Sequence, residues 1–326
     1  TLRQAVAGTF DNLHRYTFRG TAALGLNLMH DTLCARAWDE PFTLYGLAAE
    51  MLRVAEDRSA IEFTLRENAR FHDGAPMTIA DLRWTCDILL QEGAPGTRSA
   101  LRRVDRIEET GPRSLRFTFK SGMDRESPLL LGLLPVLPKH YWQSRPFGQT
   151  TLVPPLGSGP YQIVESEAGR RVAYARIADY WGRDLAVNRG HYNFDRVQFD
   201  YFRDDSVALE AFNAGDYDFR TEVNVANWAL RYDAAKIRRG EIVREQLALG
   251  RRGIERRNDH HAVRTQLLGA LGQAHAFARV LGPRADQHGH APARRAHHRL
   301  DDRGPLLRRD GEELPCAAKG NQASYT

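Results

Sequence analysis

The chain has 326 residues, enough for two domains that each have a hydrophobic core, and its formal net charge is +5. The first 250 residues are almost balanced in charge, so the basic excess belongs to residues 251–326, and a phosphate-binding surface is not expected in the main part of the chain. No apolar run reaches the roughly 18 residues of a membrane span, and three scattered cysteines exclude a disulfide framework or a zinc knuckle.

The N-terminal part predicts a strand, a helix and a turn in that order. Residues 2–8 (LRQAVAG) predict a short strand, and the apolar stretch from Ala22 to His30 predicts a helix. Residues 39–42 then predict a turn-like link, near the point where a first lobe would end.

A strand, a turn and a helix are predicted without a gap in the sequence IEFTLRENARFHDGAPMTIADLRW. Residues 61–65 alternate between apolar and polar side chains, the period of a strand with one buried face. The sequence HDG at 72–74 favours a tight turn. Thr78 is a good N-cap, and Asp81 approximates a capping box with it. A helix ending near Gln91 is therefore expected, which makes this segment one unit of an α/β domain.

The middle of the chain continues with strands and turns. Alternation predicts half-buried strands at residues 115–119 and 197–201. Prolines break up the stretch from Gly132 to Gly157. Residues 167–169 predict the turn of a hairpin.

A further helix and strand complete this part. Asp204 or Asp205 is expected to cap a helix that ends at Gly215, and a strand is expected at Tyr217–Arg220. Strands and helices alternate throughout and no internal repeat is found, which favours α/β architecture.

Residues 251–326 differ in composition from the rest. They contain seven of the 12 histidines but only two aromatic residues, and too few apolar residues for a core. One helix-like piece is expected at Val263–Leu281. Three explanations are open: a shifted reading frame in GC-rich DNA, which is favoured because it yields Arg, Ala, Gly, Pro and His; a disordered basic tail; or a divergent small domain.

Four motifs resemble, in their order, those of bacterial extracellular solute-binding proteins of the peptide-binding type (family 5). They are FTLRENARFHDGAPMTIADL, LGSGPY (156–161), ADYWGRDLAVNRG (178–190) and FRDDSVALEAFNAGDYDFR (202–220). Residues 1–57 are most similar to the branch that imports oligopeptides and microcin C. The resemblance covers residues 1–249. Members of this family capture peptides, nickel or other small solutes outside the inner membrane and pass them to an ABC importer.

The resemblance implies a periplasmic binding protein type II-like α/β fold that is incomplete in this chain. Residues 1–46 and 156–250 would form two parts of the first lobe, and residues 47–155 a small appended α/β domain. The second lobe would be missing, and residues 251–326 would be an aberrant basic tail, disordered or non-native. Because one wall of the cleft would then be lacking, the chain is expected to bind ligand weakly or not at all.

The resemblance also implies the partners and the location of the protein. The expected ligand is an oligopeptide or a peptide-like molecule, and the expected partner is the ABC transporter permease in the inner membrane. A periplasmic monomer is expected, without enzymatic activity, cofactor, metal or nucleic acid. The chain begins at Thr1 without a signal peptide, so we expect either that one has been removed or that the sequence is a fragment.

The loop after the strand at 217–220 is where the resemblance places the ligand. There Glu222 could face an amino terminus, Asn224 and Asn227 could hydrogen-bond a peptide backbone, and Trp228 could cover an apolar side chain. For each residue the alternative, equally weighted, is that it only builds the loop.

A second candidate contact with the ligand is the turn of Gly20, Thr21 and Ala22, at the start of the expected helix. The cluster at residues 203–205 is expected to be a surface or capping group instead.

Other functions find less support in the sequence. A non-functional fragment with a basic tail is the main alternative, and a hydrolase is a weaker one because no nucleophile, base and acid form a pattern. Residues 157–159 (GSG) lack the context of a P-loop or a nucleophile elbow and favour a hinge or crossover. His72 lacks a second metal ligand at a usable spacing, so a turn is favoured. The histidine pairs at 260–261 and 297–298 indicate adventitious metal binding at most, and binding to nucleic acid would depend on the tail alone.

Overall fold

The computed structural model describes residues 1–37, 43–120, 127–245, 276–280 and 317–319. Its largest element is a seven-stranded sheet in the order β12-β13-β11-β1-β10-β9-β8. Strand β1 runs parallel to β10 and to β11, and the other neighbouring pairs are antiparallel. The strands are β1 (Leu2–Ala7), β8 (Tyr161–Glu167), β9 (Arg171–Arg176), β10 (Arg196–Phe202), β11 (Phe219–Glu222), β12 (Ile242–Glu245) and β13 (Ala276–Val280).

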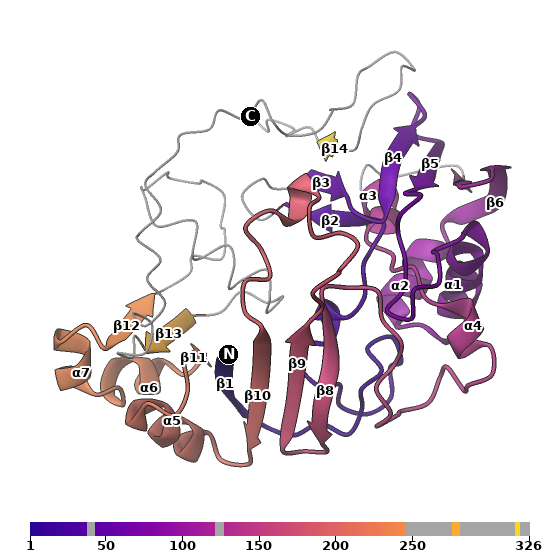
Figure 1. Ribbon diagram of the computed structural model, residues 1–326. Coiled ribbons are helices and arrows are strands. Elements are labelled where there is room, and N and C mark those ends of the chain that lie inside the picture. Colours follow the sequence, from indigo (N-terminus) through magenta and orange to yellow (C-terminus); the bar gives the residue numbers. More distant parts are fainter. Residues whose placement is uncertain (38–42, 121–126, 246–275, 281–316, 320–326) are drawn as a thin grey trace.

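Three helices accompany the β11 end of this sheet. Helix α5 (Asp205–Ala214) packs on β1 and β10, and α6 (Val225–Leu230) and α7 (Ala234–Arg238) lie close to β11–β13, as Figure 1 shows. One buried cluster under the sheet is rich in aromatic side chains and includes Phe10, Tyr161, Tyr174, Phe199 and Phe219. A smaller cluster joins α5 to β12 through Leu209, Phe212, Tyr232 and Ile242.

A second, antiparallel sheet lies on the opposite side of the molecule from α5–α7 (Figure 1). Its order is β4-β5-β7-β6, formed by β4 (Ala49–Val54), β5 (Ala60–Leu65), β6 (Val104–Gly111) and β7 (Ser114–Phe119). Helices α1 (Ile79–Glu92) and α2 (Pro95–Leu101) accompany it. Helix α1 begins at the capping box of Thr78 and Asp81, as predicted, and Asp81 also accepts a hydrogen bond from the backbone N–H of Lys139 at 2.9 Å.

Short elements complete the described structure. Strands β2 (Cys34–Arg36), β3 (Thr43–Gly46) and β14 (Ala317–Lys319) form a three-stranded sheet in the order β14-β3-β2. The remaining elements are η1 (Leu26–Leu28), α3 (Ser127–Gly132), α4 (Lys139–Trp142) and η2 (Ala186–Asn188). One buried cluster extends from Leu33 to Phe147 and includes Tyr180 and Trp181. None of the helices in the described part of the chain has the length and apolar content of a membrane span.

Most local predictions are confirmed. The strands expected from alternation are β5, β7 and β10, and the predicted hairpin joins β8 to β9. Asp204 caps α5 by accepting a hydrogen bond from the N–H of Ser206 at 2.7 Å, and Gly215 ends the helix with φ of 96°. These signals act over a few residues, which is why the sequence displays them.

The helix expected at Ala22–His30 is wrong. Only the 3-10 turn η1 forms there, preceded by Gly25 with φ of 85°. A Cβ atom at Gly25 would lie 2.7 Å from ring atoms of Phe199 and Tyr174. The segment therefore crosses the aromatic cluster as an irregular loop, and its apolar residues reflect burial rather than helical periodicity.

Two further predictions need correction. The strand expected at Tyr217–Arg220 starts at Phe219 and continues to Glu222. The helix expected at Val263–Leu281 is contradicted at residues 276–280, which form β13 between β11 and β12. Three other predicted regions lie outside the described residues: the rest of that segment, the link at 39–42, and the tail apart from β13 and β14.

Candidate functional site

The carboxyl ends of β1, β10 and β11 lie at one edge of the large sheet, because these three strands are parallel. Loop 8–25 follows β1, Arg203 and Asp204 follow β10, and residues 223–224 follow β11. Ligands of α/β proteins characteristically bind outside the carboxyl ends of parallel strands, where the loops converge. This carboxyl edge is therefore the candidate site, and the two predicted segments are in chain stretches that follow its strands, one in the loop after β1 and one after β11.

The turn of Gly20, Thr21 and Ala22 is exposed on loop 8–25. The N–H of Thr21 donates to the carboxylate of Asp11 at 2.6 Å, and Ala22 forms an isolated bridge with Asn12. Gly20 has φ of 70°, and a Cβ atom there would lie 2.5 Å from Asp11 Oδ1. Glycine is thus required for this turn, which holds its backbone at the surface of the edge.

Glu222, at the end of β11, is buried rather than open to the edge. Its Oε1 accepts a hydrogen bond from the N–H of Asn224 at 2.7 Å, and its Oε2 accepts one from the hydroxyl of Tyr232 at 3.1 Å. Asn224 is exposed, and its side-chain oxygen caps α6 by accepting from the N–H groups of Ala226 and Asn227. The segment expected as a loop is therefore partly helical.

Asn227 and Trp228 are half-buried on α6. The side-chain amide of Asn227 donates to Asp205 Oδ2 at 3.1 Å. The Trp228 ring lies edge-on to Tyr232, with 6.3 Å between centroids, and the guanidinium of Arg244 lies 5.3 Å from its centroid. The two asparagines, Trp228 and Glu222 thus form one cluster, here called the β11 cluster. No hydrogen bond or ion pair between described residues joins this cluster to Gly20–Ala22.

Arg220 and Asp205 also belong to the β11 cluster, and sequence reasoning missed both roles. Arg220 Nη2 lies 2.6 Å from Asp205 Oδ1 and 3.3 Å from Glu222 Oε2. A signal was present in the sequence: Arg220 and Glu222 are two residues apart on a strand, so their side chains share a face. The position of Asp205 opposite them could not be seen without the fold.

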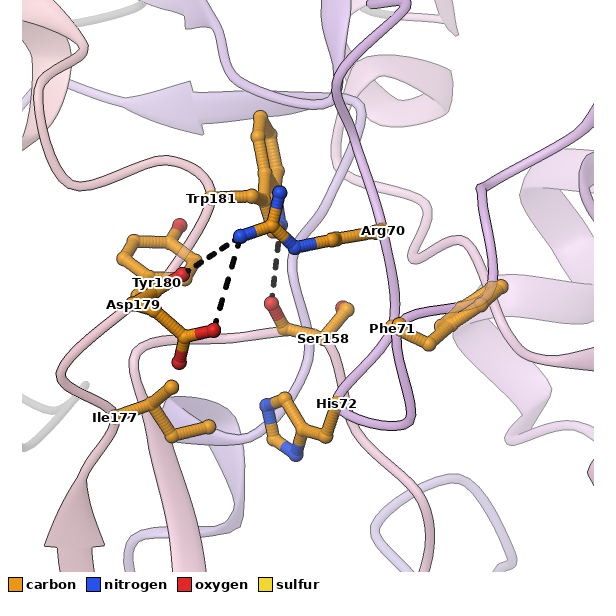
Figure 2. A pocket seen from close by; sticks show the side chains of 9 residues that line it. Arg70, Phe71, His72, Ser158, Ile177, Asp179, Tyr180 and Trp181 are labelled. Carbon is orange, nitrogen blue, oxygen red and sulfur yellow. Dashed lines mark hydrogen bonds and ion pairs between the residues drawn. The ribbon is translucent and has the colours of Figure 1, made fainter.

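The HDG turn lies at the junction between the small sheet and the segment 156–161. His72 Nε2 is 2.8 Å from the carbonyl oxygen of Gly159, and the N–H of His72 donates to the carbonyl of Gly157 at 2.9 Å. Arg70 donates to the carbonyl of Asp179 at 3.0 Å, and the Trp181 indole donates to the carbonyl of Ser158 (Figure 2). The turn predicted for His72 is confirmed, and it connects two parts of the molecule.

A small cavity of about 50 Å³ lies among these junction residues, between Arg70, His72, Asp179 and Tyr180 (Figure 2). Pockets for small-molecule ligands are several times larger. Among the described residues, no group of His, Cys, Asp and Glu side chains could hold a metal ion. Because the cavity is small and this part of the chain offers no metal site, we interpret the junction as a structural joint. The histidine pairs of the tail lie outside the described residues.

Buried ionisable groups lie behind this joint. Burial raises the pKa of Asp31 to about 8, although the hydroxyl of Tyr180 donates to its Oδ1 at 2.9 Å. Burial lowers the pKa of His30 to about 3, with a further contribution from His72, and lowers that of His14 to about 4. Asp31 is accordingly protonated, and both histidines are neutral, at pH 7.

The arrangement of the two sheets and their helices defines the class of protein. The described chain has a mixed α/β periplasmic binding protein fold, and a periplasmic oligopeptide-binding protein from Thermotoga maritima shares it. That structure superposes with a TM-score of 0.60 and 24% sequence identity, covering 74% of this chain and 44% of the other.

The family follows from closer relatives. The model for bacterial extracellular solute-binding proteins, family 5 Middle, matches residues 43–254. A protein of Brucella melitensis biotype 1 is 41% identical over 260 residues, which are 77% of this chain and 42% of that protein. The peptidoglycan-binding protein YepA of Agrobacterium fabrum is 37% identical over 256 residues, 74% of this chain and 42% of YepA.

The chain belongs to the family 5 bacterial extracellular solute-binding proteins, as its motifs predicted, and these are binding proteins rather than enzymes. It spans about two fifths of the length of the curated relatives that it matches.

Proposed function

We propose that this chain is part of the substrate-binding component of an ABC transporter for peptides. The carboxyl edge of β1, β10 and β11 forms one wall of a cleft between two lobes that close by hinge motion. The protein acts as a periplasmic monomer and delivers its ligand to a permease in the inner membrane. Residues 1–46 and 156–250 make up the lobe, and residues 47–155 the small appended domain.

The observation that supports this proposal is the parallel arrangement of β1, β10 and β11, since one predicted segment is in the loop after β1 and the other follows β11. Gly20–Ala22 present backbone at the surface of the loop after β1, and Asn224 is exposed in the segment after β11. Exposed backbone and amide groups suit an extended peptide, whose main chain supplies complementary donors and acceptors.

The described residues supply one wall of this cleft, and a cleft that encloses its ligand removes far more surface from water. We therefore expect the chain to bind oligopeptides only weakly. Calorimetric titration with a defined pool of tri- to pentapeptides tests this expectation. Heat of weak binding with all peptides recovered intact by mass spectrometry supports the proposal, and peptide cleavage contradicts it. Tight, submicromolar binding contradicts the one-wall arrangement.

The name of YepA, a peptidoglycan-binding protein, supplies a second candidate ligand class, fragments of peptidoglycan. A muropeptide stem with its sugar and the same stem without it separate the two ligand classes. Stronger binding of the sugar-bearing form favours peptidoglycan fragments, and equal binding favours plain peptides.

A further inference from the structure

Arg220 is the most completely buried cation at the carboxyl edge, with 2% of its surface exposed. Its guanidinium lies between two carboxylates, 2.6 Å from Asp205 Oδ1 and 3.3 Å from Glu222 Oε2. Desolvation by burial opposes its charge, but the hydrogen bond and charge of Asp205, together with Tyr232 and Glu222, raise the pKa of Arg220 overall. Arg220 therefore connects the start of α5 to the end of β11 as a permanent cation.

Every oxygen of the two carboxylates has a partner within the protein. Asp205 accepts from Arg220 with Oδ1 and from the side-chain amide of Asn227 with Oδ2. Glu222 accepts from the N–H of Asn224 with Oε1, and from Tyr232 and Arg220 with Oε2. Glu222 cannot turn toward a ligand without breaking its buried hydrogen bonds to Tyr232 and Arg220, and half-exposed Asp205 would have to give up its bonds to Arg220 and Asn227.

The exposed side chains that directly follow β11, at residues 223–225, carry no charge. Val223 is 72% exposed and Val225 is 82% exposed, and Asn224 between them is exposed as well. This stretch of the edge is thus apolar and amide in character, whereas the exposed charges of Arg203 and Asp204 lie after β10.

We propose that Arg220 is a positioning residue that pairs with Asp205 and Glu222 and holds both carboxylates in contacts within the protein, so that residues 223–225 present side chains without charge to an uncharged, apolar stretch of an extended ligand. This inference rests on the proposed peptide-binding function and makes it more specific. Glu222 acts as an internal brace of the wall, and the amino terminus of the ligand is not bound there.

The test compares the tetrapeptide Ala-Val-Ala-Val with its N-acetylated form, each titrated into the full chain while backbone amide NMR signals are followed. We expect signals of residues 223–228 to shift with both peptides, with affinities that agree within about twofold. Glu222→Gln, which removes the charge but keeps an acceptor oxygen, is expected to change both affinities by the same factor.

Arg220→Met provides the converse experiment, because it leaves two carboxylates without their cation. This variant is expected to bind the free-amine peptide about tenfold or more tightly than the acetylated one. Arg220→Lys is expected to bind both peptides with similar affinity, as the native chain does. If Arg220→Met fails to fold, the comparison of the native chain with Glu222→Gln still decides the matter.

Several outcomes separate failure of this inference from failure of the proposed function. An affinity for the free-amine peptide that falls about tenfold on acetylation in the native chain, but not in Glu222→Gln, would overturn the inference. Shifts confined to Gly20–Ala22 would also overturn it while leaving peptide binding intact. The absence of any shift with either peptide at millimolar concentration would overturn the proposed function and the inference together.

Discussion

His72 Nε2 and the carbonyl oxygen of Gly159 are 2.8 Å apart although 87 residues separate them in the chain. This contact joins the HDG turn beside the small sheet to the segment that enters β8. The most recognisable motif of the chain therefore acts as a structural joint, at a distance in the fold from the carboxyl edge where the ligand is proposed to bind.

His72→Ala should destabilise the chain by about 1–2 kcal/mol, because it removes a partly buried hydrogen bond and leaves the carbonyl of Gly159 without its partner. Urea unfolding followed by tryptophan fluorescence measures the change. His140→Ala is the matched control: its imidazole pairs with Asp73 at 2.8 Å on the exposed side of the same turn, so the expected loss is below about 1 kcal/mol. Equal effects of the two substitutions would contradict the joint.

The second prediction concerns stability between pH 5 and pH 8. Below pH 6.5 the unfolded chain binds protons at His14 and His30 that the folded chain excludes, whereas folded Asp31 keeps one proton that the unfolded chain has lost. Unfolding then takes up about one proton net, so stability rises with pH. Above pH 6.5 only Asp31 contributes, unfolding releases its proton, and stability falls until about pH 8.

The free energy of unfolding, measured by urea denaturation, should therefore be highest near pH 6.5. On either side of this maximum it should change by about 1.4 kcal/mol per pH unit for each proton exchanged on unfolding. Asp31→Asn keeps a neutral group beside Tyr180 and should remove the fall between pH 6.5 and pH 8. The lowered pKa values of His72 and His191, which burial causes, add to the rise below pH 6.5. Persistence of the fall between pH 6.5 and pH 8 in Asp31→Asn would show that another group titrates.

Gly159→Ala should cost about 2 kcal/mol or more, because its Cβ atom would lie 2.5 Å from the carbonyl oxygen of Leu28 and 2.8 Å from the carbonyl carbon of Met29. Gly96→Ala is the control within α2, where nothing lies within 4 Å of an added Cβ atom. That change should stabilise the chain by about 0.5–1 kcal/mol, since alanine favours the helix. Thermal unfolding of both variants measures the contrast, and a tolerated Gly159→Ala would show that this segment can move away from residues 28–29.

Thr78→Ala should destabilise the chain by about 1 kcal/mol through loss of the capping box at α1. Ser99→Ala, an exposed position in α2, should change stability by less than about 0.5 kcal/mol. Chemical denaturation of both variants provides the measurement. A Thr78→Ala effect as small as the control would mean that the contact of Asp81 with Lys139 is enough to hold the start of the helix.

Much of the fold could be predicted because its signals are local. Alternation identified β5, β7 and β10, and the cap at Thr78 and the stop at Gly215 identified where α1 begins and α5 ends. The apolar stretch around Gly25 was misassigned because burial against Phe199 and Tyr174 produces the same composition as a helix face. The motifs also led to the family, whose model matches residues 43–254.

The candidate site was predicted as a set of positions but not as an arrangement. The local sequence was enough to predict Asn224 as a polar residue after a strand. Its role as the cap of α6 is also local, because its side chain accepts hydrogen bonds from N–H groups two and three residues further along the chain. The burial of Glu222, its pairing with Arg220 and the approach of Asp205 from α5 depend on strand order and helix packing. Short-range propensities determine elements, whereas the partners of a charged side chain depend on contacts between segments far apart in the chain, and those contacts exist only once the sheet has assembled.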